Sequence, residues 1–172
     1  MRAEDEAAVV ACIPSLRRYA RGLTADRDRA DDLVQDTLEK AWRRFSLWQR
    51  RAGVRAWMFG IMHNQFVDQL RAERSRPFVS SEGEPPDVAQ RATQSDRIEV
   101  LDLERSLRRL APEQREVLLL VGVEELSYRE VALAVGVPIG TVMSRLSRAR
   151  ERLRSDLQGR PEAAATKLQR VK

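Results

Sequence analysis

Apolar residues recur along this chain at steps of three and four, the spacing that places side chains on one face of an α-helix. In the N-terminal half the pattern predicts three helices. The first has an apolar face from Val9 to Leu23, and Pro14 inside it predicts a kink or a restart. The second runs from about Arg27 to Trp48, and the third from about Arg55 to Ser75. We therefore expect an all-α fold.

The second predicted helix has two chemically different faces. Its inner face is expected to contain Val34, Leu38, Ala41, Trp42 and Phe45. Its outer face carries the polar residues Asp32, Gln35, Asp36, Glu39, Lys40 and Arg43. Acidic residues early in a helix interact favourably with the positive end of the helix dipole, which explains them without any partner. The same face is also suited to docking a basic partner, and periodicity alone leaves both interpretations open.

The residues from Pro77 to Asp96 have the composition of a flexible linker. They include three prolines, a glycine and small polar residues, with four acidic side chains and one arginine. We therefore predict two small helical domains, at residues 1–76 and 97–158, joined by an acidic linker at 77–96. The tail at 159–172 lacks a clear apolar face and is expected to fray.

The second domain is predicted to open with two helices. One carries apolar residues at helical spacing from Val100 to Leu110. The next begins at Pro112, because proline costs least at a first helical position.

A helix-turn-helix over Glu124–Arg154 is the most specific local pattern in the chain. Ser127 and Glu130 have the spacing of a capping box, which starts a helix by satisfying its free backbone N–H groups. Gly136 ends that helix, because glycine adopts the left-handed conformation at little cost. A second helix is predicted from about Ile139 to Leu157.

The second helix of this motif is amphipathic and basic. Its apolar face consists of Val142, Leu146, Ala149 and Leu153. The opposite face and its flanks carry Gly140, Thr141, Met143, Ser144, Arg145, Ser147 and Arg148. In a DNA-binding helix-turn-helix this helix enters the major groove, where Arg148 is long enough to bind a guanine edge and Arg145 can meet a phosphate. The alternative is a helical hairpin whose arginines are merely solvated.

Three residues of the N-terminal half bear on its chemistry. Trp48 lies in a loop, Ser46–Val54, that also contains Arg51; it can stack on an unpaired base or cover the local core. His63 is the only histidine and Cys12 the only cysteine, so we expect no zinc site and no cofactor. We interpret His63 as a surface or DNA-facing residue.

Composition restricts the class of protein further. A net charge of +5 favours a polyanionic partner. No apolar run approaches a membrane span and the acidic start is unlike a signal peptide, so we expect no membrane insertion. A single cysteine suits the reducing cytoplasm. An enzyme or a small-molecule substrate is not expected, because the sequence has no metal-ligand cluster, phosphate-binding glycine loop or nucleophile–base pair.

Four separate blocks of the chain resemble the extracytoplasmic-function (ECF) sigma factors of bacteria. They are DDLVQDTLEKAW at Asp31–Trp42, AWMFGIMHNQFVDQLR at Ala56–Arg71, LAPEQREVLLL at Leu110–Leu120 and LSYREVALAVGVPIGTVMSRLSRARERL at Leu126–Leu153. They follow the family's order and spacing, which is more specific than any one block. The resemblance implies an N-terminal domain that recognises and helps melt the promoter −10 element. It implies a C-terminal domain that reads the −35 element, with both domains binding core RNA polymerase.

The resemblance also implies roles for individual positions. Core polymerase docking is implied for Asp32, Gln35, Asp36 and Glu39. The −10 surface is implied for Trp48, Arg51, His63 and Asn64, with phosphate contacts from Arg71 and Arg74. Contact with the −35 duplex is implied for Tyr128, Arg129, Ser144, Ser147 and Arg148, beside Thr141, Met143 and Arg145 of the same motif.

This sequence departs from the family pattern at four positions. One is Pro138, which stands where the N-cap of the recognition helix is commonly serine. Many members carry arginine where this chain has Gly60 and His63, and a basic residue where it has Met143. The family also implies an anti-sigma factor as a partner.

The alternative function is a dimeric helix-turn-helix regulator that acts without polymerase. For that class the sequence offers no long apolar stripe for dimerisation and no ligand-pocket or phospho-acceptor pattern.

Overall fold

A computed structural model describes residues 3–24, 26–48, 53–75 and 94–158 of the protein, and within these ranges it contains helices and no strand. The elements are α1 (Ala3–Thr24), α2 (Arg27–Arg44), a short 3₁₀ helix η1 (Phe45–Leu47), α3 (Val54–Arg74), α4 (Gln94–Arg109), α5 (Pro112–Gly122), α6 (Tyr128–Val135) and α7 (Ile139–Gln158). The all-α prediction is confirmed. The predicted tail and most of the predicted linker lie outside the described residues, and α4 begins at Gln94, inside the last part of that linker.

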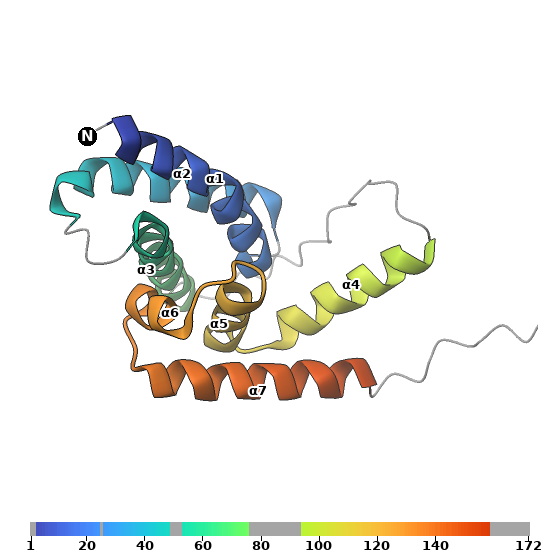
Figure 1. The fold of residues 1–172 in the computed structure, drawn as a ribbon. Coiled ribbons are helices and arrows are strands. Elements are labelled where there is room, and N and C mark those ends of the chain that lie inside the picture. Colours follow the sequence, from blue (N-terminus) through green and yellow to red (C-terminus); the bar gives the residue numbers. More distant parts are fainter. Residues whose placement is uncertain (1–2, 25, 49–52, 76–93, 159–172) are drawn as a thin grey trace, which may run out of the picture.

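The N-terminal half is a three-helix unit in which α1 and α2 form a hairpin over α3 (Figure 1). Asp26 starts α2, because its carboxylate accepts a hydrogen bond of 2.8 Å from the backbone N–H of Arg29. The predicted restart at Pro14 is wrong, since α1 is continuous from Ala3 to Thr24. Pro14 has no N–H group to donate to the backbone carbonyl four residues earlier. Because Pro14 lies on the exposed side of α1, water can solvate that carbonyl instead.

Trp42 is an exception to the predicted inner face of α2. Its side chain is 58% exposed, so its placement in the core was wrong. The buried residues of α2 are Ala30, Leu33, Val34, Thr37 and Ala41. Neighbouring positions in a helix differ by about 100° around the axis, so the residue after Ala41 points to the edge of the core side. Residues three or four positions away from a buried apolar residue therefore include some at the edge of the buried face as well as some at its centre.

The helix-turn-helix forms as its local signals predict. The Ser127 hydroxyl accepts a hydrogen bond of 3.3 Å from the backbone N–H of Glu130, and the Glu130 carboxylate accepts one of 2.8 Å from the backbone N–H of Ser127. Gly136 adopts the left-handed conformation with φ of 71° and ends α6. On α7, Val142, Leu146 and Ala149 are buried. The capping box, the corner glycine and the apolar face of α7 are confirmed.

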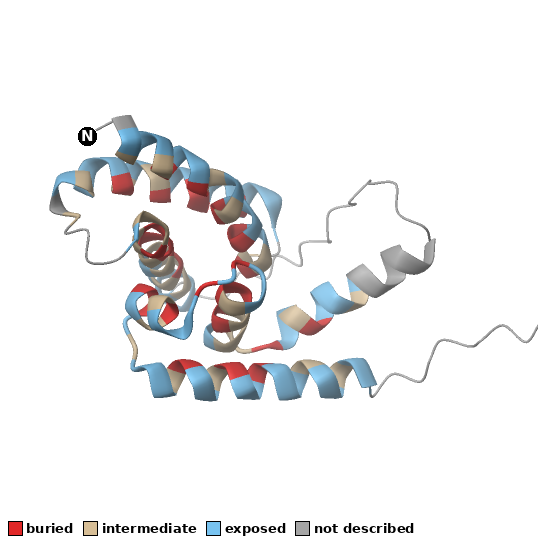
Figure 2. Cartoon of the chain, viewed as in Figure 1, coloured by how far each residue is buried: buried red, intermediate tan, exposed pale blue. Residues whose placement is uncertain are grey.

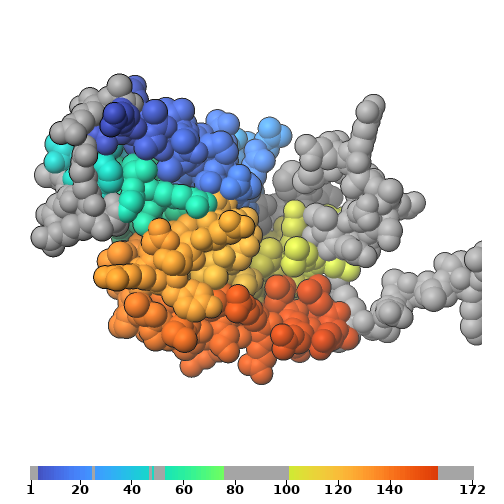
Figure 3. All heavy atoms as spheres, viewed as in Figure 1, coloured from blue at the N-terminus to red at the C-terminus, as the bar shows by residue number. Residues whose placement is uncertain are grey.

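The two halves of the chain pack against each other, with α5 on α1 and α6 on α3. Their buried residues form one continuous core, and in the space-filling view the C-terminal helices lie directly against the N-terminal ones (Figures 2 and 3). The approach is close, because a Cβ atom on Gly60 would lie 3.2 Å from the backbone oxygen of Ala134. A side chain at position 60 would therefore crowd the backbone of α6.

Candidate nucleic-acid and polymerase interfaces

The residues predicted to read the −35 element lie on α6 and α7, away from the core. Exposed positions include Met143, Ser144, Ser147 and Arg148 on α7 and Tyr128 and Arg129 at the start of α6. Thr141 and Arg145 are half-buried on the flanks of α7. Figure 2 shows α7 with one buried side against the molecule and one exposed side toward solvent. This is the arrangement that a groove-binding helix requires.

Two side chains of this surface have distinct geometry. The Ser144 hydroxyl donates a 3.0 Å hydrogen bond to the backbone oxygen of Thr141, which fixes its rotamer and leaves its lone pairs as acceptors. Arg148 is exposed and forms no ion pair with the rest of the described chain. Its guanidinium is therefore available for a partner outside the protein.

The predicted docking residues Asp32, Gln35, Asp36 and Glu39 are all exposed on one face of α2. Glu39 pairs with Arg43 at 2.5 Å, and Lys40 donates a 2.9 Å hydrogen bond to Gln65 of α3. Trp42 lies two helical turns after Gln35, at the edge of the same face. Sequence reasoning missed Trp42 as a surface residue, although its seven-residue spacing from Gln35 carried the signal.

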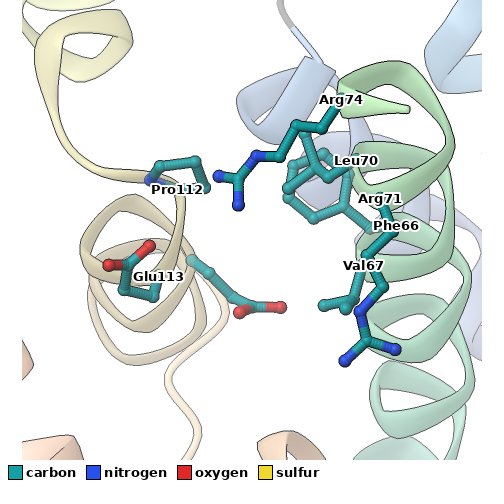
Figure 4. A pocket seen from close by; sticks show the side chains of 8 residues that line it. Phe66, Val67, Leu70, Arg71, Arg74, Pro112 and Glu113 are labelled. Carbon is teal, nitrogen blue, oxygen red and sulfur yellow. The ribbon is translucent and has the colours of Figure 1, made fainter. Parts of the chain in front are cut away.

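The predicted −10 surface lies on α3 and is only partly open. Asn64, Arg71 and Arg74 are exposed. Arg71 and Arg74 border a cleft of about 250 Å³ between α3 and α5, which is also lined by Phe66, Val67, Leu70, Pro112, Glu113 and Glu116. In Figure 4 the Arg74 side chain extends from α3 toward Pro112 at the start of α5. Arg51 lies outside the described residues.

Trp48 packs on its own half of the molecule. Its ring centroid lies 5.5 Å from that of Phe45 and 5.9 Å from that of Trp57. Phe45 and Trp57 are themselves in edge contact at 5.9 Å. The half-buried Trp48 thus completes an aromatic cluster, which favours the interpretation that it covers the local core.

His63 faces the C-terminal half of the chain, with 15% of its side chain exposed. Its Nδ1 lies 2.5 Å from Oε1 of Glu116 on α5. The hydroxyl of Tyr19 donates a 2.9 Å hydrogen bond to the same oxygen. Burial raises the pKa of the Tyr19 hydroxyl well above its ordinary value, and the adjacent Glu116 carboxylate adds to this shift. In this arrangement His63 is engaged inside the protein and not presented to solvent.

Known families match both halves of the chain. Residues 9–63 match the family described as the Sigma2 domain of PhyR, and residues 101–153 match Sigma-70, region 4. The ECF RNA polymerase sigma factor EcfG of Rhodopseudomonas palustris is 34% identical over 145 residues, covering 84% of this chain and 80% of that protein. This chain belongs to the ECF sigma factors. The sigma factor SigL of Mycobacterium tuberculosis is also similar, with 35% identity over 151 residues, covering 83% of this chain and 82% of SigL.

Solved structures agree with this assignment. The sigma factor RpoE of Bartonella quintana, in complex with the anti-sigma factor NepR, matches with a TM-score of 0.74 and 32% identity. That alignment covers 91% of this sigma factor and 98% of RpoE. CnrH, in complex with the cytosolic domain of CnrY, matches with a TM-score of 0.68 and 25% identity, covering 91% and 89% of the two chains. As a member of this family, the protein binds core RNA polymerase and directs promoter-specific initiation of transcription.

The described residues contain no group of three or more His, Cys, Asp or Glu side chains that could hold a metal ion. They also contain no single helix long and apolar enough to cross a membrane. Within these residues α6 and α7 reach that length and apolar content only together, across a bend of 103°.

Proposed function

We propose that this sigma factor reads the −35 duplex with α6 and α7. The carrying observation is that Ser144, Ser147 and Arg148 are exposed on the side of α7 opposite the buried Val142 and Leu146. A groove-facing arginine recognises guanine through O6 and N7, while arginines on the flanks meet phosphates. Tyr128 and Arg129, Thr141, Met143 and Arg145 border the same surface.

We assign −10 recognition to the polar side of α3. Asn64 is exposed there, and an amide can pair with the edge of an extruded base. Arg71 and Arg74 extend the surface with two positive charges for phosphates. His63 and Arg51 of the preceding loop belong to the same predicted set. Trp48 belongs to it as well, with its ring packed on Phe45 and Trp57.

Core polymerase docking is assigned to the exposed face of α2. Three carboxylates, Asp32, Asp36 and Glu39, suit a basic partner surface, and Trp42 adds a large apolar side chain at the edge of that face. Tryptophan is enriched among residues that dominate binding energy at interfaces. We therefore place an aromatic anchor beside the acidic face.

An anti-sigma factor is part of the proposal. RpoE and CnrH, the two structural relatives described above, are each in complex with another protein, the anti-sigma factor NepR and the cytosolic domain of CnrY. Sigma factors select promoters and are not themselves enzymes, so catalysis belongs to the core polymerase. The partners of the sigma factor, polymerase and promoter DNA, place its action in the bacterial cytoplasm.

The −35 assignment is tested by comparing two arginines of α7. Arg148→Ala removes a base contact, which is worth about 1–3 kcal/mol, and should reduce discrimination between the natural and a changed −35 sequence by roughly 5- to 150-fold. Arg152→Ala is the matched control, because it removes a flanking charge and should weaken binding equally for both sequences. Transcription is measured with core polymerase on both templates. Undiminished discrimination by the Arg148→Ala protein would refute the groove-facing register.

A further inference from the structure

Met143 is a large apolar side chain on the solvent side of α7. It is 53% exposed, within the surface assigned to the −35 duplex. The buried side of α7 is formed by Val142, Leu146 and Ala149, so the core does not require Met143. Many ECF sigma factors carry a basic residue at this position, whereas methionine has no charge to offer a phosphate. We therefore expect Met143 to contact a different feature of the DNA.

Helical spacing places Met143 in a row of exposed residues along α7. Ile139 lies four residues before it and Ser147 four residues after it, and positions four apart are neighbours on a helix surface. Ile139 is 44% exposed, and Ser147 is exposed as well. A second exposed row runs beside the first and consists of Gly140, Ser144 and Arg148. The outer side of α7 thus places two apolar side chains next to a row that ends in an arginine.

The two rows suit different features of a base pair. In the major groove the bases present hydrogen-bond donors and acceptors, and thymine also presents its 5-methyl group. Ser144 and Arg148 can form hydrogen bonds with base edges. Met143 has no N–H or O–H group and only a weakly accepting sulfur, so a thymine methyl group is the feature that it fits best. Its flexible side chain can adapt to the shape of the groove.

Helix geometry limits where such a thymine can lie. Each residue advances about 1.5 Å along a helix, so Met143 and Arg148 are separated by about 7.5 Å along α7. Successive bases of one DNA strand are about 3.4 Å apart. A thymine in contact with Met143 therefore lies within about two base pairs of the guanine that Arg148 binds.

We propose that Met143 reads the 5-methyl group of a thymine in the −35 element and so sets part of the promoter preference of this sigma factor. The proposal rests on the proposed −35 function, since Met143 reaches base edges only if α7 lies in the major groove. Covering one methyl-sized group favours binding by about fourfold. Thymine should be preferred by about this factor over the same base without its methyl group.

The test removes the methyl group from the DNA. Templates carry a promoter mapped with the parent protein, and each thymine of the −35 element, on either strand, is replaced in turn by uracil. Uracil keeps every hydrogen-bonding group of thymine and lacks only the methyl group. Core polymerase with the sigma factor is titrated on each template, and the concentrations that give half-maximal transcription on the thymine and uracil templates are compared.

Three variants of the full chain are compared with the parent. Met143→Ala removes the proposed contact, and Met143→Leu keeps an apolar side chain of similar size. Leu157→Ala is the matched control, because Leu157 is 43% exposed on the same helix but lies about 21 Å further along it. The thymine-to-uracil ratio compares two templates for one protein, so a difference in the amount of folded protein cancels.

The parent should prefer thymine to uracil about fourfold at one or two adjacent positions. Met143→Ala should lose this preference, while Met143→Leu and Leu157→Ala should keep it. A parent that does not distinguish the two bases would overturn the proposal. So would a Met143→Ala protein with the parental preference, or a −35 element without an A·T pair.

A failure of the −35 assignment itself gives a different pattern. If α7 does not lie in the groove, Arg148→Ala keeps the parental discrimination between the natural and the changed −35 sequence. Uracil then has no effect on the parent or on any variant. If Arg148→Ala loses that discrimination while Met143→Ala keeps the thymine preference, α7 reads the −35 element and only the role of Met143 is wrong.

Discussion

Replacing Trp42 with alanine should weaken the binding of core RNA polymerase without unfolding the sigma factor. Trp42 is 58% exposed at the edge of the acidic face of α2. Because a tryptophan buries about 150–250 Å² in full, the exposed part corresponds to roughly 90–140 Å² that a partner can cover. At about 25 cal/mol per Å², its loss costs about 2–3.5 kcal/mol of binding free energy. The dissociation constant should therefore rise by roughly 30- to 400-fold.

The assay is an anisotropy titration of labelled sigma factor with core polymerase, accompanied by a melting curve for each variant. Val10→Ala is the control, because Val10 is 55% exposed but lies on α1, outside the docking face. It should bind as the parent does. If Trp42→Ala binds core polymerase as tightly as the parent, the aromatic anchor is refuted. A loss of binding that merely follows a loss of folded protein would show that Trp42 supports the fold.

Three further predictions concern the other surfaces and the capping box. Asp32→Lys combined with Asp36→Lys should weaken core binding at an unchanged melting temperature, since both residues are exposed; a pull-down at parental strength would contradict the acidic docking face. Asn64→Ala should slow promoter opening more on duplex DNA than on a template with an open −10 bubble, because extruding a base costs a few kcal/mol; equal slowing on both templates would exclude that role. Hydrogen bonds from Ser127 hold the pKa of Glu130 below its usual 4.5, so their stabilisation is present above that pH and is lost as pH falls through the lowered pKa. Ser127→Ala should therefore lower the free energy of unfolding in urea by about 1 kcal/mol at neutral pH and by less in acid; an equal loss at both pH values would contradict this.

The features that sequence alone predicted correctly are those determined within one or two helical turns. The capping box joins Ser127 and Glu130, three residues apart, and Gly136 ends α6 through its own backbone conformation. The apolar face of α7 follows from the spacing of Val142, Leu146 and Ala149. Each signal depends on neighbours that the helix itself brings together, so no knowledge of the tertiary contacts is needed.

The features that sequence missed depend on residues far apart in the chain. His63 and its partner Glu116 are 53 residues apart, and Arg18 and Glu124 are 106 apart. Nothing local distinguishes a glutamate that will be buried against two arginines from one that stays in water. Gly60 shows the same limit. The sequence alone does not reveal that a Cβ atom at this position would lie close to the backbone of α6.

Start-site mapping with sigma-free core polymerase tests the central claim most directly. Core polymerase and a genomic DNA template are incubated with and without the protein, and the 5′ ends of the transcripts are compared. The assignment of −10 readout to α3 and −35 readout to α7 predicts new start sites that share one pair of upstream elements. The same start sites with and without the protein, together with a stable dimer that binds duplex DNA in the absence of polymerase, would contradict the account and favour a helix-turn-helix regulator.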